Sequence, residues 1–273
     1  MIVHSDNLSI EQIADSGQCF RMNKMDKDRY RLVAYGRYLE ITQVDDVTVD
    51  FHCSEEEFQE VWQDYFDLAY DYKRIVDQLI NSSDEFLRKA AEYGRGIRIL
   101  RQEPFEALIS FIISQNKNIP AIKSCIEAIC RQYGKRKISK GSDQFEYYTF
   151  PTPEVLAEAK LEDLRKCKTG YRDKYIICAA QAVASRSLDL NHLINCTHEE
   201  TVGRLREIHG IGAKVADCIS LYGLHHIEAF PVDVWIKRVL KEIYQDNFDL
   251  EQYQGYAGIV QQYMFYYIRF MQG

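Results

Sequence analysis

The hydrophobic period of the chain changes near Pro104, and this change limits the fold more than any other feature. Residues 29–53 alternate β-branched or aromatic residues with polar ones, and turn residues interrupt them twice. Such alternation is typical of antiparallel strands. From Phe105 onward, apolar residues instead recur at the spacing of helices that are buried on one face. The sequence therefore predicts an α+β chain, with an antiparallel sheet followed by a mostly helical region.

The predicted elements begin at turn or capping residues. Ser54 with Glu57, and Thr197 with Glu200, have the spacing of capping boxes, which open helices. The first box opens an acidic helix, and a second helix is predicted to run to about residue 92. The sequence also predicts strands over 29–35, 37–43 and 47–53, and later helices near 153–166, 173–186, 198–208 and 251–271.

Charge is distributed unevenly along the chain. The formal net charge is −7, but residues 54–85 hold ten acidic side chains against two basic ones, so the rest of the chain sums to +1. Residues 131–140 hold five bases and no acid, and residues 160–174 sum to +3. Local potential selects a partner more than net charge does. The pattern permits nucleic-acid binding, although solvated surface charge would explain any single cluster equally well.

Composition narrows the class of protein. The chain is 46% hydrophobic and 27% charged, as globular proteins are. All apolar runs are far shorter than the ~20 residues of a membrane-spanning helix, so no membrane partner is expected. Eight cysteines without a CxxC pair favour reduced thiols over zinc ligands. The first residues lack the features of a secretion signal. We expect a cytoplasmic protein, associated with the nucleoid if the source is bacterial.

The segment IHGIGAK, residues 208–214, is the first functional motif. Gly210 and Gly212 stand between two predicted helices, where glycine permits a tight reversal and close approach to another surface. Backbone N–H groups beside a helix N-terminus suit a DNA phosphate. The pattern predicts a helix-hairpin-helix over about residues 198–223. An ordinary turn between helices remains the alternative.

Lys214 follows this turn and has two interpretations. It could be a surface contact for phosphate, or it could be a nucleophile if its surroundings keep the amine partly unprotonated. A helix N-terminus and burial beside the apolar residues of the following helix would both favour the neutral amine. Position alone does not decide between the two roles.

Asp233 lies nineteen residues after Lys214, within a Pro-Val-Asp sequence. It could simply cap the next helix. It also suits the chemistry of N-glycosidic bond cleavage, because a carboxylate stabilises the oxocarbenium-like sugar while an amine attacks C1′. The pair therefore points to a lysine Schiff base on DNA.

Gly210-x-Gly212-x-Lys214 followed by Pro231-Val232-Asp233 resembles the helix-hairpin-helix Gly/Pro-Asp superfamily of DNA glycosylases. Further segments resemble its human-type 8-oxoguanine DNA glycosylases, and together they span nearly the whole chain. The resemblance implies an N-terminal antiparallel sheet domain over 1–98 and a helical glycosylase core of two subdomains over 99–273. The segments are SGQCFR (16–21), GIRILRQEPFEALISFIISQNKNI (96–119), GYRDKY (170–175), KVADC (214–218) and YAGIVQQYMF (256–265).

The resemblance also implies roles for individual residues. Lys214 would be the nucleophile and Asp233 its carboxylate partner. Gly17 would offer its carbonyl to the N7–H that distinguishes 8-oxoguanine from guanine. Gln261 would bind the Watson–Crick edge of the flipped base, and a buried amide on that helix needs partners in any case. Phe265 and Cys218 would stack on opposite faces of the base, although an aromatic in a helix core is the plainer interpretation of Phe265.

On the DNA side, the resemblance assigns Asn116, Tyr171 and Arg172 to the gap left in the duplex and to the orphaned base. Gly210 and Gly212 would contact the backbone. Tyr171, which follows a glycine within a basic stretch, suits a wedge, and a plain loop tyrosine is an equally good interpretation of it.

The chain departs from the family pattern at three positions. Ala121 stands where eukaryotic members have an arginine that reads the opposite cytosine, Lys117 replaces an asparagine, and Trp235 replaces a histidine near phosphate. We therefore predict a relaxed opposite-base preference.

No cofactor is expected to be required. Only Cys218 lies beyond Cys196, so the cysteine run of iron–sulfur glycosylases is absent. The hairpin carbonyls could hold a monovalent cation, as the resemblance suggests.

The expected function is bifunctional: excision of 8-oxoguanine from duplex DNA and cleavage at the resulting abasic site, by a monomer. One alternative is a glycosylase of this superfamily for an alkylated or pyrimidine base, against which Gly17 and Gln261 argue. The other is a non-catalytic helix-hairpin-helix DNA-binding protein, which leaves the spacing of Asp233 without a reason.

Overall fold

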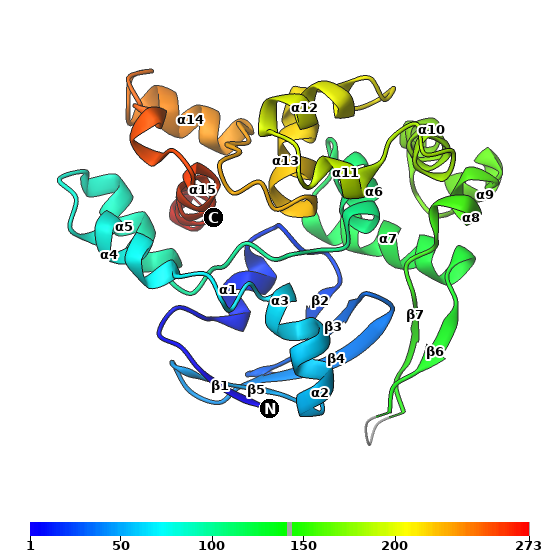
Figure 1. Cartoon of the computed structure of the whole chain (residues 1–273), viewed down its shortest axis with the longest axis horizontal. Coiled ribbons are helices and arrows are strands. Elements are labelled where there is room, and N and C mark those ends of the chain that lie inside the picture. Colours follow the sequence, from blue (N-terminus) through cyan, green and yellow to red (C-terminus); the bar gives the residue numbers. More distant parts are fainter. Residues whose placement is uncertain (141–143, 273) are drawn as a thin grey trace.

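The computed structural model describes residues 1–140 and 144–272. A twisted sheet lies at one end of the molecule, and helices stand on it in two groups (Figure 1). One group contains α4, α5, α14 and α15, and the other contains α6 to α13. The predicted α+β fold, with a sheet domain and two helical parts, is confirmed.

The sheet is fully antiparallel and has the strand order β1-β5-β4-β3-β2. Three predicted strands are present as β3 (Arg29–Ala34), β4 (Arg37–Gln43) and β5 (Thr48–Phe51). Buried Leu32, Leu39 and Ile41 face the core, as the alternation predicts. The edge strands β1 (Ile2–His4) and β2 (Met22–Lys24) were not predicted, because three residues are too few to show a period.

The acidic helix after the sheet is irregular. It runs through α2 (Glu55–Glu57), a π-helical turn (Phe58–Trp62) and α3 (Gln63–Tyr65). Ser54 accepts from the Glu57 N–H, but the Glu57 carboxylate accepts from Trp62 Nε1 instead of closing the box. The predicted capping box at Ser54 is therefore wrong in its second half. The box at Thr197 and Glu200 is complete and opens α12.

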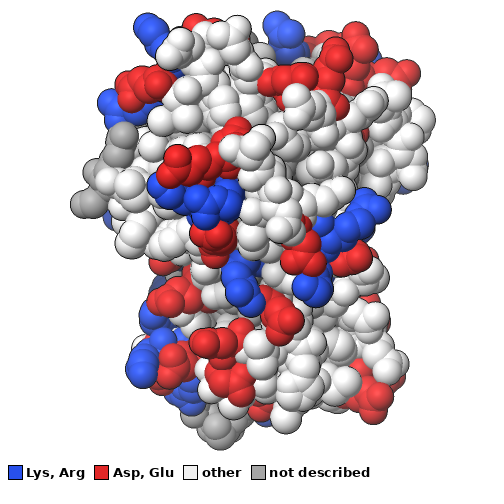
Figure 2. All heavy atoms as spheres, turned by 90° about the vertical axis from the view of Figure 1, so that its left-hand side faces the viewer, with Lys and Arg blue, Asp and Glu red and all other residues white. Residues whose placement is uncertain are grey.

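The predicted helix to residue 92 is two helices, α4 (Tyr72–Ile80) and α5 (Glu85–Gly94), because Asp84 caps a new start. Both pack in the helical core, where α5 lies against α15 (Ala257–Gln272). On this side of the molecule, acidic and basic side chains intermingle (Figure 2). Pairs such as Lys89 with Glu85, 2.6 Å apart, explain why the acidic segment makes no separate acidic field here.

The helical core contains more breaks than its sequence period suggests. The predicted helix 153–166 is two short helices, and the last predicted helix begins with a 3-10 turn (Leu250–Tyr253) that is separated from α15 at Gly255 (φ +87°). The basic stretch 131–140 enters an unpredicted hairpin, β6 (Arg136–Ile138) with β7 (Glu146–Tyr148). The remaining helices are α1 (Ile10–Asp15), α6 (Pro104–Ser114), α7 (Ile119–Tyr133), α8 (Pro153–Ala157), α9 (Leu161–Lys166), a 3-10 turn (Gly170–Arg172), α10 (Asp173–Ala184), α11 (Leu190–Leu193), α12 (His198–Arg206), α13 (Ala213–Gly223) and α14 (Val234–Glu242).

The sheet and the helices have separate hydrophobic cores, which buried polar contacts join. The Arg98 guanidinium donates to four backbone carbonyls, those of Asn7, Phe66, Asp67 and Tyr70. Gln18, also buried, bonds the backbone of Arg98 and Leu100. These bonds hold the loop between α1 and β2 against the helical core, and this loop carries Gly17. Among the described residues, no helix is long and apolar enough to cross a membrane.

Candidate active site

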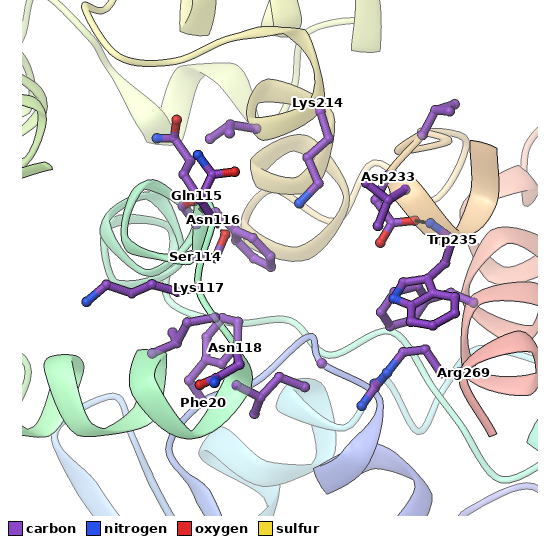
Figure 3. Close-up of a pocket in the computed structure, with 18 of the residues that line it drawn as sticks. Phe20, Ser114, Gln115, Asn116, Lys117, Asn118, Lys214, Asp233, Trp235 and Arg269 are labelled. Atoms are coloured by element: carbon purple, nitrogen blue, oxygen red, sulfur yellow. Dashed lines mark hydrogen bonds between the residues drawn. The ribbon is translucent and has the colours of Figure 1, made fainter. Parts of the chain in front are cut away.

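A cleft of about 690 Å³ opens between the two helical groups, and Lys214 and Asp233 both line it. A smaller pocket of about 50 Å³ continues inward, and the same two residues line it as well. Figure 3 shows their side chains ending in one opening, Lys214 from the start of α13 and Asp233 from the start of α14. The structure thus brings together the two residues that the chemistry requires.

Lys214 lies in the first turn of α13, two residues after the exposed N-cap Gly212. The sequence suggested that burial would help to keep its amine neutral, but the side chain is exposed in the free protein. Its helix turns the apolar residues Val215, Ala216 and Cys218 inward and leaves Lys214 on the cleft wall. The surroundings of Lys214 in the free protein therefore do not remove water from this amine.

Asp233 caps α14, which is one of the two roles that the sequence predicted for it. Its Oδ1 atom accepts from the backbone N–H groups of Trp235 at 3.0 Å and Ile236 at 2.9 Å. Both bonds end on one oxygen, so the carboxylate keeps a second oxygen, Oδ2, outside the cap. The cap and the cleft role are compatible, because the cap fixes the direction of the carboxylate.

The cleft is positively charged although the whole chain is negative. Its described lining contains four bases, Lys117, Lys214, Lys237 and Arg269, and a single acid, Asp233. Field lines concentrate in such a cleft and attract polyanions. The local sum of +3 therefore favours DNA despite the net charge of −7.

The inner pocket collects all four residues that the sequence assigned to base binding: Gly17, Cys218, Gln261 and Phe265. Gly17 has φ +79°, and a Cβ atom there would lie 3.4 Å from the Phe265 ring. Cys218 is 4% exposed, and burial raises the pKa of its thiol to about 11, with Lys214 acting in the opposite direction. A pocket of about 50 Å³ holds only one or two waters, so a base enters only if lining side chains move.

Gln261 is buried, and its amide nitrogen has a backbone partner. It is 3% exposed, and its Nε2 donates to the Pro231 carbonyl at 3.1 Å. This bond ties α15 to the loop that leads into Asp233. The amide therefore has a fixed place at the pocket.

Asn116 and Tyr171 form one lip of the cleft. The Asn116 backbone has φ +50°, an unusual value for a residue with a side chain, and its Nδ2 lies 3.3 Å from the Tyr171 hydroxyl. Tyr171 is 53% exposed and packs edge-on against Tyr175. An exposed aromatic held from behind fits the predicted wedge.

Arg172 lies differently from the prediction. It is 5% exposed, with its guanidinium 4.4 Å from the Tyr171 ring, and it donates to the backbone carbonyls of Gln115 and Thr169. In the free protein it is thus beneath the lip and not on it. The side chain supports Asn116 and Tyr171 from below.

The two hairpin glycines differ in whether the folded protein itself requires a glycine. Gly210 has φ +94°, and a Cβ atom would lie 2.2 Å from the Tyr175 ring. Gly212 has an ordinary φ of −87°, and nothing lies within 4 Å of its Cβ position. The protein itself therefore requires glycine only at Gly210, whereas Gly212 leaves open space that a DNA backbone could approach.

The three departures from the family pattern lie at or near the cleft. Ala121 is in the first turn of α7, where Asn118 caps its N–H. The Lys117 amine points away from the opening and donates to the Lys168 carbonyl (Figure 3). Trp235 lines the cleft beside Asp233. Only a methyl group projects from the position where the arginine would be.

Sequence reasoning missed several lining residues. Phe111 and Tyr222 line the inner pocket. Because their helices are apolar, their pattern predicts core residues, and both are indeed buried. Arg269, which lies over the Phe265 ring at 5.2 Å, is the one charged residue in α15, and this was a usable signal.

Known proteins match the chain along most of its length. Residues 1–108 match the 8-oxoguanine DNA glycosylase N-terminal domain, and residues 109–254 match the HhH-GPD superfamily of base excision DNA repair proteins. A Methanothermobacter thermautotrophicus protein named "Probable N-glycosylase/DNA lyase" is 34% identical over 233 residues, which are 75% of this chain and 72% of that protein. The Saccharomyces cerevisiae N-glycosylase/DNA lyase is 30% identical over 269 residues, 90% of this chain and 70% of that one.

A solved structure agrees over the whole fold. The Clostridium acetobutylicum 8-oxoguanine glycosylase/lyase, in complex with double-stranded DNA containing cytosine opposite 8-oxoG, has a TM-score of 0.90 and 36% identity, covering 98% of this chain and 93% of that one. The sheet, the hairpin and the cleft define a base excision DNA repair protein. The chain belongs to the HhH-GPD superfamily, in its 8-oxoguanine DNA glycosylase branch.

Proposed function

We propose that the protein is a bifunctional DNA glycosylase and abasic-site lyase that excises 8-oxoguanine from duplex DNA. The observation that carries this proposal is the shared cavity: Lys214 and Asp233 line both the outer cleft and the inner pocket. An amine and a carboxylate at the entrance to a pocket that could widen to admit a base suit attack on the sugar of an extruded nucleotide.

Lys214 is the proposed nucleophile. Its neutral amine forms a bond to C1′ while the C1′–N9 bond breaks, and the electron pair of that bond leaves with the base, which takes up a proton. Asp233 lies beside the same carbon and stabilises the positive charge that develops on the sugar. This step needs no redox partner.

The lyase step follows from the same bond. Opening of the sugar ring breaks C1′–O4′, O4′ takes a proton, and a Schiff base forms between C1′ and Nζ. Loss of a C2′ proton then expels the 3′ phosphate as the C3′–O bond breaks, because the Schiff base accepts the electron pair. Water finally releases Lys214.

The base pocket suits oxidised guanine. The Gly17 carbonyl accepts no hydrogen bond from the described residues, and Gly17 lines the pocket. An N7–H, which 8-oxoguanine has and guanine lacks, would satisfy it. The Gln261 Oε1 atom offers an acceptor to the Watson–Crick edge of the base. A base without a donor there would leave this buried acceptor unpaired, so the pocket would reject it strongly.

The opposite-base preference is proposed to be relaxed. Ala121 is too short to hydrogen-bond the orphaned base, whereas Asn116 and the exposed Tyr171, which are bonded to each other, would contact any base by stacking or through one hydrogen bond. Single-turnover excision of 8-oxoguanine opposite C, A, G and T should differ by less than about tenfold, since Ala121 cannot make the bidentate contact of an arginine. A steep preference for C would contradict this expectation.

We also propose that the enzyme acts as a monomer without a required cofactor. A monovalent cation at the carbonyls of the hairpin is compatible with this proposal, and the dependence of DNA affinity on K⁺ against a large organic cation would reveal it.

Borohydride trapping tests the central step. Wild-type protein mixed with an 8-oxoguanine duplex and borohydride should give a covalent protein–DNA adduct, and Lys214→Gln should give none. Lys89→Gln, on the far-off α5, is a matched control that should be trapped like the wild type. An adduct with Lys214→Gln would assign the nucleophile elsewhere.

A substrate panel separates the second candidate function. Duplexes that contain an alkylated purine or an oxidised pyrimidine should be cleaved much more slowly than 8-oxoguanine duplexes. Faster cleavage of either would move the protein to another substrate class while leaving the Lys214 chemistry intact.

A further inference from the structure

Tyr222 is a buried side chain of the inner pocket that the proposed chemistry does not use. It lies two turns after Lys214 on α13, so Lys214, Cys218 and Tyr222 share one face of the helix at i, i+4 and i+8. Its ring stacks on Phe111, with centroids 5.2 Å apart and an angle of 18°. The same pocket is lined by Gln261.

The Tyr222 hydroxyl lies between two glutamine oxygens. It is 2.6 Å from Gln262 Oε1 and 3.3 Å from Gln261 Oε1. Burial raises the pKa of Tyr222 well above its usual value, so the hydroxyl keeps its proton. One proton makes one strong bond, and only the shorter distance is in the usual O–H···O range. Gln262 therefore takes the proton.

The orientations of both amides are fixed from their other ends. Gln261 Nε2 donates to the Pro231 carbonyl at 3.1 Å, and Gln262 Nε2 donates to the Ser16 carbonyl at 3.0 Å. A rotated amide would place two acceptors face to face. Among the described residues, no strong donor reaches the Gln261 Oε1 atom, which is thus a buried acceptor beside the pocket. Such an arrangement is costly in an empty site.

These bonds also join the loops that carry the reacting and recognising groups. Ser16 immediately precedes Gly17, and Pro231 is two residues before Asp233. Through Gln262, the Tyr222 hydroxyl therefore holds the Gly17 loop against α15. Gln261 in turn holds the Asp233 loop against the same helix.

We infer that Tyr222 is a positioning residue that sets the base selectivity of the pocket. By committing its proton to Gln262, it fixes the Gly17 loop and keeps Gln261 Oε1 open for an N–H donor on the edge of an extruded guanine-type base. An adenine-type base presents a bare ring nitrogen at the corresponding position and leaves this acceptor unpaired. The inference rests on the proposed function and adds a selectivity residue to it.

Tyr222→Phe tests the inference because it keeps the ring and its stacking while removing the hydroxyl. The readout is the ratio of two single-turnover rates on matched duplexes: excision of 8-oxoguanine, and strand cleavage at a preformed abasic site. An abasic site has no base to recognise, so the ratio isolates the pocket. We expect the ratio to fall about tenfold, the effect of losing one buried hydrogen bond. Selectivity for 8-oxoguanine over 8-oxoadenine should fall with it.

A second variant approaches the same hydroxyl from its acceptor. Gln262→Met removes the strong acceptor, so the Tyr222 proton turns to Gln261 Oε1 and competes with the base. The same ratio should fall, and the double variant with Tyr222→Phe should recover part of the loss. This pattern is specific to hydrogen bonding and would not follow from a packing defect.

Tyr263→Phe is the matched control. Tyr263 is buried on α15 beside Gln262, and its hydroxyl has no hydrogen-bond partner among the described residues. Its removal should leave the ratio unchanged. An unchanged ratio in Tyr222→Phe, or an equal loss of both rates, would overturn the inference. Absence of 8-oxoguanine excision by the wild type would instead overturn the proposed function, while abasic-site cleavage would still report on Lys214.

Discussion

Gly17→Ala is the most informative single substitution, because it perturbs the base pocket without touching Lys214 or Asp233. Gly17 has φ +79°, in the left-handed region, and its Cβ position lies 3.4 Å from the Phe265 ring and 3.7 Å from Ile119. The backbone strain of an alanine in this region is about 1–2 kcal/mol. The contacts are ordinary or slightly tight, so they add little.

Two effects with different readouts follow from this geometry. The strain lowers the free energy of unfolding by about 1–2 kcal/mol, which for a chain of this size lowers Tm by about 2–8 °C. In the pocket, the methyl group and a shifted carbonyl disturb the hydrogen bond to N7–H. Loss of such a bond is worth about 1–3 kcal/mol, or about 5- to 150-fold in excision rate.

The assay compares single-turnover excision of 8-oxoguanine with cleavage of a preformed abasic site, alongside urea unfolding. Excision should fall within that range and abasic-site cleavage should change little. Gly203→Ala is a matched control, since Gly203 lies within α12 with nothing within 4 Å of its Cβ position. It should raise stability by about 0.5–1 kcal/mol without changing either rate. Wild-type excision by Gly17→Ala would refute the assignment of Gly17 to base recognition.

Three further predictions follow. Asp233→Asn should keep the cap of α14 and change stability by less than about 0.5 kcal/mol, yet slow excision about 100-fold in single-turnover assays. Arg172→Ala should lower the free energy of unfolding by about 1–3 kcal/mol, because the Gln115 carbonyl loses its buried donor. Tyr171→Ala should instead slow excision with little effect on urea unfolding. Burial raises the pKa of Glu106 to about 7, against an opposing effect of Arg21. Since this acid binds its proton more tightly in the folded state, its contribution to stability is present below about pH 4.5 and is lost as pH rises through 7. Glu106→Gln should therefore flatten the dependence of the unfolding free energy on pH between these values. An unchanged dependence would contradict burial of Glu106 as its cause.

The regular parts of the fold were predictable because their patterns are long enough. Strands β3 and β4 show several alternations, and α6 shows a complete apolar stripe. The short edge strands and the hairpin of β6 and β7 have three residues each, so no period can emerge. The break at Asp84 was missed because an N-cap inside a helical pattern looks like a solvent-facing polar residue.

The candidate site was partly predictable for a different reason. Lys214, Asp233 and the hairpin glycines form local motifs whose spacing is visible in the chain. The burial of Arg172 and the exposure of Lys214 depend on contacts with distant elements, such as Gln115 from the end of α6. Sequence spacing carries no information on such contacts, so the burial of Arg172 was not predicted and the environment of Lys214 stayed open between a surface contact and a shielded amine.

The placement of the proposed nucleophile on α13 offers a way to couple the proposed chemistry to base recognition. Lys214 is exposed on the cleft wall, Cys218 is 4% exposed four residues later, and Tyr222 is 5% exposed after four more. One helix face thus runs from Lys214, where we propose that the sugar lies, along the inner pocket to Tyr222. Because an α-helix rises 1.5 Å per residue, a displacement of the base by one helical turn, about 5.4 Å, would carry C1′ out of reach of the amine. In this proposal, a base that does not reach Tyr222 also leaves its sugar beyond the reach of Lys214. Selection of the base then needs no step separate from the positioning of the sugar.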